Sequence, residues 1–223
     1  MQWDRPGLFI SVEGIDGAGK SLQAVLLHGS LLLAGYSTVR TRQPGGTEVG
    51  KQIREILLSV DRQGERLSHL TEFLLFAADR HLLTVTCITP HLDEGGIVIC
   101  DRAADSSIAY QGMGNGLSIP SIIQMNSQTQ PEPDFTVLLD LDPDLMHERL
   151  KHKSYDRYEM EDVDFMHRVR NGFTTIANNN PERFITIDAT MSVELTAELV
   201  LKYAMERVLA KGILKGGSHG EDR

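Results

Sequence analysis

The sequence predicts an α/β protein in three layers, with a five-stranded parallel sheet between two layers of helices. Strand-like segments alternate with helix-like segments along the whole chain. The expected strands are apolar on both faces, since Ile97–Cys100 and Val137–Leu139 are continuous apolar runs. Such strands are typical of a parallel sheet that helices cover on both sides. A chain of 223 residues is long enough to bury the core of one such domain.

The elements of the first half follow from local composition. Leu8–Glu13 is short and rich in apolar and β-branched residues, which predicts a buried strand. An apolar helical pattern, a second strand, two further helices and a third strand follow it. These elements are expected at Lys20–Ala34, Thr38–Thr41, Glu48–Ser59, Ser68–Leu92 and Ile97–Cys100.

The second half continues the alternation. Pro131-Glu132-Pro133 is a rigid lead-in to the fourth strand, and Asp142-Pro143 is an N-cap followed by proline at the first helical position. The expected elements are Ile119–Gln128 (helix), Phe135–Asp140 (strand), Pro143–Lys151 and Val163–Asn178 (helices), Arg183–Ile187 (strand) and Val193–Ala210 (helix). We expect one domain over residues 1–215, a small mobile lid at about 151–162, and a flexible glycine-rich tail at 216–223.

The segment Gly14-Ile15-Asp16-Gly17-Ala18-Gly19-Lys20-Ser21 fits G-x-x-x-x-G-K-[ST] at every fixed position, between an expected strand and an expected helix. Backbone N–H groups of such a loop wrap a phosphate at the positive end of a helix. We expect Lys20 to contact the β and γ phosphates of a nucleotide, and Ser21 to offer its hydroxyl to Mg²⁺. The competing interpretation is a glycine-rich turn that only joins strand to helix.

Composition restricts the class of partner and the compartment. The net charge of −9 argues against a nucleic-acid-binding surface, which would need a basic stripe. Cys87 and Cys100 fall in apolar segments, so we expect both to be buried and reduced, as in a cytoplasmic protein. The N-terminus shows no signal-peptide pattern, and no apolar run is long enough to cross a membrane.

Further polar motifs lie mainly where expected strands end, which favours a single site at the carboxyl edge of the sheet. Together with the phosphate-binding loop, they resemble thymidylate kinase, a P-loop nucleoside monophosphate kinase family. The resemblance runs from about Leu8 to Leu209, and its segments occur in the family's order. They are Glu13–Ser21, Thr41–Thr47 (T-R-Q-P-G-G-T), Asp101–Gly112 (D-R followed by S-I-A-Y-Q-G) and Asp156–Glu159 (D-R-Y-E).

This resemblance implies transfer of the γ-phosphoryl group of ATP to dTMP, with Mg²⁺, by a homodimer. It implies that residues of the loop and Ala189 bind ATP. Implied acceptor-binding residues are Arg42, Phe76, Arg80, Arg102, Ser107, Tyr110 and Gln111. Ser21 and Asp101 are the implied metal-site residues, and the implied catalytic groups are Lys20, Asp16, Arg102, Arg42, Lys153 and Arg157.

Each residue also has a plainer interpretation. Arg42 and Arg102 could be surface arginines paired with carboxylates, Asp16 a turn former, and Asp101 a cap for the following turn. From spacing alone, Phe76 and Arg80 would be a core ring and a surface cation on one helical face. Ser107, Tyr110 and Gln111 could form an ordinary polar helix face, and the lid cations Lys153 and Arg157 a solvated charge run.

The sequence departs from the family pattern near the acceptor. Gln43 replaces a usual glutamate, Ala103 an aromatic residue or histidine, and Asn115 an arginine. These changes keep a second hypothesis open, a kinase for dUMP or a 5-substituted dUMP. A third hypothesis is a nucleotide-binding module without phosphoryl transfer. A GTPase is disfavoured because the chain has no N-K-x-D segment for guanine.

Overall fold

A computed structural model describes residues 5–59, 67–150 and 162–215. Its sheet has five parallel strands in the order β2-β3-β1-β4-β5. The strands are β1 (Leu8–Glu13), β2 (Thr38–Arg42), β3 (Ile97–Asp101), β4 (Phe135–Asp140) and β5 (Phe184–Asp188). The fold prediction is confirmed, and the predicted strand ends differ from the observed ones by at most one residue, as is usual at element boundaries.

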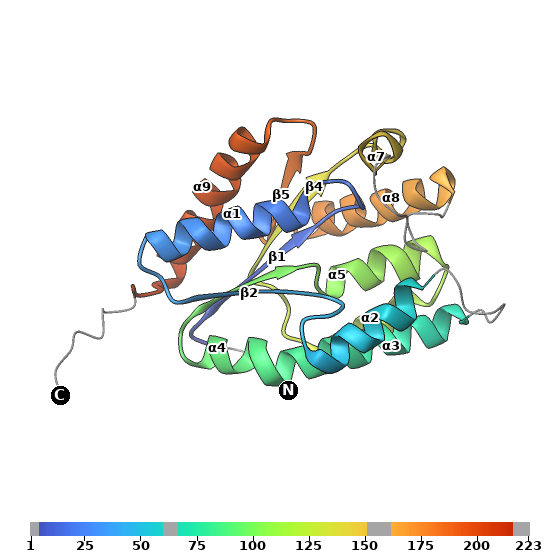
Figure 1. The fold of residues 1–223 in the computed structure, drawn as a ribbon, viewed down its shortest axis with the longest axis horizontal. Coiled ribbons are helices and arrows are strands. Elements are labelled where there is room, and N and C mark those ends of the chain that lie inside the picture. Colours follow the sequence, from blue (N-terminus) through green and yellow to red (C-terminus); the bar gives the residue numbers. More distant parts are fainter. Residues whose placement is uncertain (1–4, 60–66, 151–161, 216–223) are drawn as a thin grey trace.

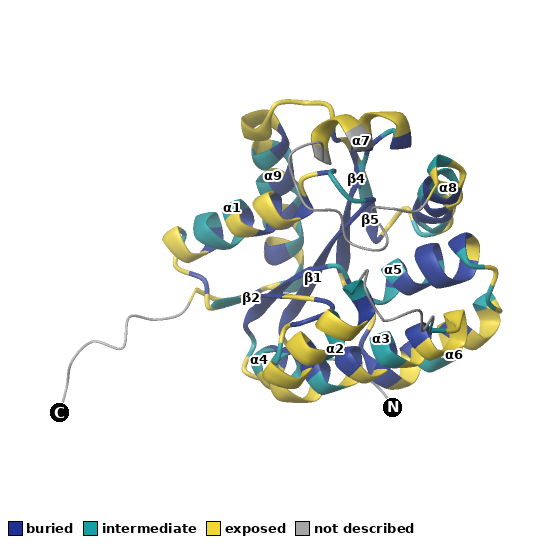
Figure 2. Cartoon of the chain, turned by 45° about the vertical axis from the view of Figure 1, so that its right-hand side comes forward, coloured by how far each residue is buried: buried dark blue, intermediate teal, exposed yellow. Residues whose placement is uncertain are grey.

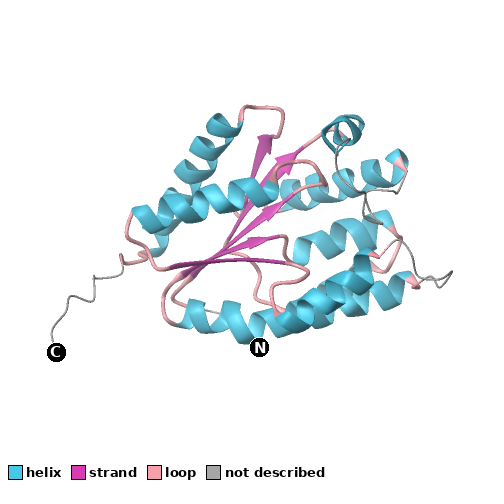
Figure 3. Cartoon of the chain, in the orientation of Figure 1, coloured by secondary structure: helices cyan, strands magenta, loops and turns pink. Residues whose placement is uncertain are grey.

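Helices flank the sheet on both faces (Figures 1 and 3). They are α1 (Lys20–Leu33), α2 (Glu48–Leu58), α3 (His69–Leu83), α4 (Thr89–Asp93), α5 (Ala104–Ser107), α6 (Ile119–Thr129), α7 (Pro143–Leu150), α8 (Val163–Asn179) and α9 (Val193–Lys211). Two π-helical segments, η1 (Thr84–Ile88) and η2 (Ile108–Gly114), continue α3 and α5.

The predicted helix Ser68–Leu92 is one helical stretch that includes a π-helical segment. Pro90 is the second residue of its last part, α4, and proline has no N–H to continue the α-helical ladder. The hydroxyl of Thr84 donates to the Arg80 carbonyl within the same stretch. The wider turn of η1 therefore coincides with the region where the regular hydrogen-bond pattern is interrupted.

The helical stretch Ala104–Gly114 is absent from the predicted elements. Its sequence contains Asp, two Ser and two Gly, which are weak helix formers. The stretch forms because α8 packs against η2 and buries Ala109 and Tyr110. Tertiary packing thus overrides local propensity in a segment that carries predicted site residues.

The core lies between the sheet and the two helical layers (Figure 2). Ile10, Val12 and Ile99 pack with α1 and α9, while Phe9 and Val98 pack against the α3–α4 stretch. Because side chains alternate along a strand, β1 sends apolar groups to both faces. This double burial makes the sheet rigid, and it fixes the carboxyl ends of the strands from which the loops of the site emerge.

The two cysteines are free, as expected, but their burial differs. Cys100 in β3 is fully buried, whereas Cys87 in η1 is half-buried, so the prediction of a buried Cys87 is wrong. Cys87 packs against the edge of the cluster beneath α3–α4, and its other side faces outward. None of the described helices is long and apolar enough to cross a bilayer.

Candidate active site

The phosphate-binding loop joins β1 to α1 in the middle of the sheet. The strands β3 and β4 lie on either side of β1, so the strand order reverses where this loop emerges. Gly14 has φ 137°, and a Cβ there would lie 2.4 Å from the Leu139 carbonyl oxygen. Gly19 caps α1 with φ 94°. The sequence therefore needs glycine at both positions to turn the chain into the helix.

Lys20 is buried and folded back onto its own loop. Its Nζ donates to the Ile15 carbonyl at 2.7 Å and lies 3.8 Å from an Asp16 carboxylate oxygen. Burial, followed by the positive charge of Arg102, lowers the pKa of Lys20 to about 8. The ammonium group is thus charged at neutral pH and lies beside the loop that would hold phosphates.

Ser21 and Asp101 meet across the first turn of α1. The Ser21 hydroxyl donates to the carboxylate of Asp101, which ends β3 and is largely buried. A hydroxyl and a carboxylate are oxygen donors of the kind that Mg²⁺ prefers. The donor chemistry of this pair fits the metal that the sequence predicts there.

A cleft of about 580 Å³, including its open mouth, lies next to the loop. The residues that line it come from the loops after β1 and β2, from α2 and α3, and from the stretch after β3. They are Asp16, Gln43, Pro44, Arg54, Leu58, Phe76, Arg80, Arg102, Ala103, Ser106, Ser107, Tyr110 and Gln111. Six of the seven predicted acceptor residues are among them, and Arg42 is the exception.

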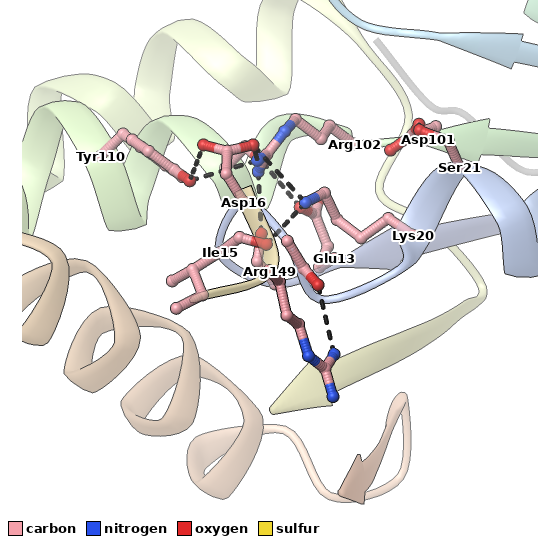
Figure 4. Close-up of polar contacts among 12 residues, drawn as sticks. Glu13, Ile15, Asp16, Lys20, Ser21, Asp101, Arg102, Tyr110 and Arg149 are labelled. Carbon is pink, nitrogen blue, oxygen red and sulfur yellow. Dashed lines mark hydrogen bonds and ion pairs between the residues drawn. The ribbon is translucent and has the colours of Figure 1, made fainter. Parts of the chain in front are cut away.

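Asp16, Arg102 and Tyr110 form one polar network between the loop and the cleft (Figure 4). Arg102 Nη2 donates to Asp16 Oδ1 at 2.7 Å and to the Tyr110 hydroxyl at 3.2 Å, and that hydroxyl donates to Asp16 Oδ2 at 3.1 Å. Burial raises the pKa of Asp16, but the charges of Arg102 and Lys20 outweigh it and lower that pKa to about 2. Asp16 is therefore a carboxylate that keeps two cations close together.

Arg80 is not a surface cation, because only 2% of it is exposed. Its Nε donates to Gln43 Oε1 at 3.2 Å, Nη1 to Asn126 Oδ1 at 2.7 Å, and Nη2 to the Ser107 hydroxyl at 2.6 Å. Burial lowers its pKa to about 10, which leaves it charged at neutral pH. A guanidinium has five N–H donors, so two remain beyond these three bonds among the described residues.

Arg54, which the sequence did not predict as a site residue, lines the cleft, whereas the predicted Arg42 does not. Arg42 is the last residue of β2, and its side chain is exposed. Arg54 lies on α2, and its Nη1 donates to the Pro44 carbonyl at 3.2 Å. The motif around Arg42 gives no signal for Arg54, because the packing of α2 on α3 brings it there.

The expected lid cations Lys153 and Arg157 lie outside the described residues. Ala189 follows β5, and its carbonyl accepts from Arg149 Nη2 at 2.8 Å. Nη1 of the same arginine donates to the Gly17 carbonyl at 3.2 Å. Arg149 thus links the phosphate-binding loop to the loop whose Ala189 is predicted to bind ATP, and residue spacing alone could not show this link.

The comparison with known families decides the identity. A sequence profile described as thymidylate kinase matches residues 12–200. The chain belongs to the thymidylate kinase family. It is 43% identical over 212 residues to a thymidylate kinase of an Exiguobacterium species. The matched region covers 94% of this chain and 99% of that relative. A thymidylate kinase of Deinococcus radiodurans is 44% identical over 197 residues, covering 86% and 94%.

A solved structure agrees with this family. The crystal structure of thymidylate kinase from Ehrlichia chaffeensis matches with a TM-score of 0.70 and 34% identity, over 91% of this chain and 98% of that one. The activity of thymidylate kinases is the ATP-dependent phosphorylation of dTMP to dTDP. The predicted family, fold and reaction are therefore confirmed.

Proposed function

We propose that the cleft binds dTMP, that loop 14–21 and Ala189 bind ATP, and that the two nucleotides meet at the Asp16–Arg102 pair. The observation that carries this proposal is that pair itself. Asp16 belongs to the phosphate-binding loop, and Arg102 lines the cleft. Transfer of a phosphoryl group requires the donor and acceptor to be held in line while its negative charge is stabilised.

Lys20 and Arg102 both bring positive charge to Oδ1 of Asp16, at 3.8 and 2.7 Å respectively. Arg102 can bind acceptor phosphate oxygens through its planar guanidinium, and Lys20 can bind the phosphates of ATP once it leaves the Ile15 carbonyl. Asp16 reduces the repulsion between these cations. Among the described residues, Arg54 adds a further positive charge at the cleft, and we place it with the acceptor-phosphate groups.

At the base end, we assign Phe76 to stack on thymine and Arg80 to donate to the base carbonyl O4. Ser107 and Gln111 lie within the same buried wall and offer further polar contacts. Tyr110 packs edge-on against Phe165 and Phe173, with ring centroids at 6.3 and 6.1 Å, so its ring is held in place. A fixed ring beside Asp16 would crowd a 2′-hydroxyl and favour a deoxynucleotide.

Ser21 and Asp101 would hold Mg²⁺, whose role on binding is to neutralise developing charge on the phosphates of ATP. We also retain Arg42, Lys153 and Arg157 as groups that act on the phosphates. Arg42 lies one residue before Gln43, which lines the cleft. Closure of segment 151–162 over ATP would exclude water.

We propose that the chain works as a cytoplasmic homodimer, in which α3 and α6 cover each other. Leu70 and Leu74 lie one turn apart on α3, and Ile123 lies on the neighbouring α6. Their exposed fractions are 56%, 48% and 51%, respectively. Large apolar side chains clustered on adjacent helices are typical of protein interfaces. Light scattering of the purified chain should give twice the monomer mass, and Leu74→Glu should reduce that mass.

The acceptor is tested by ADP formation with a panel of monophosphates. Highest kcat/KM with dTMP supports the proposal. Gln43 accepts a hydrogen bond from Arg80, the residue assigned to the base. The family pattern usually has a glutamate at this position. This difference beside the base site is the observation that favours dUMP or a 5-substituted dUMP as the acceptor. Preference for one of these would redefine the base site, and ATP binding without turnover would make the chain a nucleotide-binding module.

A further inference from the structure

Glu13 is a buried carboxylate with no role in the proposed phosphoryl transfer. It is the last residue of β1 and is 0% exposed. Its Oε1 accepts from the Ala103 N–H at 2.7 Å, and its Oε2 accepts from the Ser106 hydroxyl at 2.6 Å. Both carboxylate oxygens are therefore directed at the segment that follows Arg102.

The backbone at Arg102 needs such support. Among the non-glycine residues that the structure describes, Arg102 is the one with φ in the left-handed region, at 68°. L-amino acids with side chains adopt this region only where the surroundings impose it. The Arg102 N–H donates to the Val12 carbonyl at 3.0 Å, and the next N–H, of Ala103, donates to Glu13. The end of β1 thus holds two successive amides of this turn.

The second Glu13 contact reaches the Arg102 guanidinium itself. The Ser106 hydroxyl gives its proton to Glu13, so its lone pairs are free for Arg102 Nη1 at 3.2 Å. Arg102 Nη1 also donates to the Gly14 carbonyl at 3.0 Å, while Nη2 is bound by Asp16. A carboxylate at position 13 therefore sets the direction of the serine hydroxyl and, through it, one edge of the guanidinium.

We propose that Glu13 is a positioning residue for the acceptor phosphate, because its carboxylate fixes the turn at Arg102 and orients Ser106 toward the Arg102 guanidinium. The proposal rests on the proposed role of Arg102 in binding that phosphate. Glu13 itself does not touch the nucleotide, since it lies beneath the loop and does not line the cleft. Its effect is therefore on acceptor affinity and much less on ATP.

The protonation state of Glu13 adds a pH dependence to this arrangement. Burial, with the nearby carboxylate of Asp105, raises the pKa of Glu13 to about 7. The titratable and charged groups that face it from the surrounding elements are Lys20, Arg80, Cys100, Arg102, Asp105 and Arg183. A protonated Glu13 has one acceptor oxygen fewer, as a glutamine would, so Ser106 loses its fixed orientation below about pH 7.

The test measures dTMP and ATP dissociation constants by calorimetry for wild type, Glu13→Gln and Ser11→Ala. Ser11 is a matched control, because it lies two residues earlier on the same strand face, is equally buried, and shares a 2.8 Å hydroxyl contact with Thr136. At pH 8 we expect Glu13→Gln to weaken dTMP binding by about tenfold and ATP binding by less than about twofold. Ser11→Ala should leave both within about twofold.

The pH profile separates positioning from a merely structural role. The second pKa of a phosphate monoester is about 6, so both proteins lose dTMP affinity in acid. The ratio of the wild-type affinity for dTMP to that of Glu13→Gln removes this common effect. We expect it to fall from about ten at pH 8 toward one at pH 6, because wild-type Glu13 is then protonated. Ser106→Ala should show the same narrowing, which preserves the test if Glu13→Gln does not fold.

The outcomes are distinguishable. Unchanged dTMP binding in Glu13→Gln, equal losses for dTMP and ATP, or a ratio that does not vary with pH would each overturn the inference. Arg102→Ala tests the underlying assignment. If Arg102→Ala binds dTMP like wild type, the proposed acceptor site fails; if it weakens dTMP binding while Glu13→Gln does not, only the role of Glu13 fails.

Discussion

Replacing Glu13 by glutamine should make the folded chain more stable at pH 8, even as it weakens acceptor binding. Burial raises the pKa of this carboxyl from its ordinary 4.5 to about 7. At about 1.4 kcal/mol for each pKa unit, the ionised side chain costs the folded state about 3 kcal/mol relative to the protonated one. Glutamine has a similar shape and no charge, so it avoids this cost.

The direction of the pH dependence follows from proton binding. The unfolded chain releases the Glu13 proton near pH 4.5, whereas the folded protein keeps it until about pH 7. Between these values the folded state holds more protons, so the contribution of this group to stability falls as pH rises and is lowest above pH 7. The advantage of Glu13→Gln should therefore be small at pH 4.5 and complete by pH 8.

Thermal unfolding at several pH values measures this difference. For a chain of this length, 1 kcal/mol changes Tm by about 2–4 °C, so Glu13→Gln should melt about 6–12 °C above wild type at pH 8. Ser11→Ala, in the same strand, should differ from wild type by an amount that does not depend on pH. Two results would contradict this expectation: Glu13→Gln less stable than wild type at pH 8, or a difference in Tm between them that does not vary with pH. Either result would show that burial of the ionised Glu13 carboxylate does not destabilise the folded state.

Three further predictions concern the nucleotides directly. Lys20→Ala should lower kcat by at least about a hundredfold while the melting curve stays cooperative, since the charge on the transferred phosphoryl group is then unbalanced; near-wild-type turnover would remove Lys20 from the reaction. Arg80→Ala should raise the KM for dTMP by about tenfold or more with little change in the KM for ATP, because a buried donor to the base is lost; equal changes in both would place Arg80 outside the base site. Tyr110→Phe should retain discrimination against ribonucleotides and Tyr110→Ala should lose most of it, because the ring supplies the bulk; similar ribonucleotide use by both variants, measured by kcat/KM, would contradict that reason.

The fold was predictable because its signals are local. Short continuous apolar runs that alternate with helical patterns are typical of buried parallel strands. The glycines of the phosphate-binding loop are required by backbone geometry, as at Gly14, where a Cβ would collide with the Leu139 carbonyl. The helix over Ala104–Gly114 was not predictable, since its residues favour turns and packing against other elements, chiefly α8, stabilises it.

The sequence by itself determined the residue types of the site: a loop that can wrap phosphate, a lysine and a serine at its end, and an aromatic residue and an arginine one helical turn apart. The tertiary structure decided which charges meet and which groups lose water. It placed Arg54 rather than Arg42 at the cleft, buried Arg80 among neutral oxygen acceptors, and set Glu13 beneath Arg102. The periodicity of the sequence indicates which face of an element is apolar. The distances between side chains of different elements, and the loss of water around each of them, depend on how those elements pack.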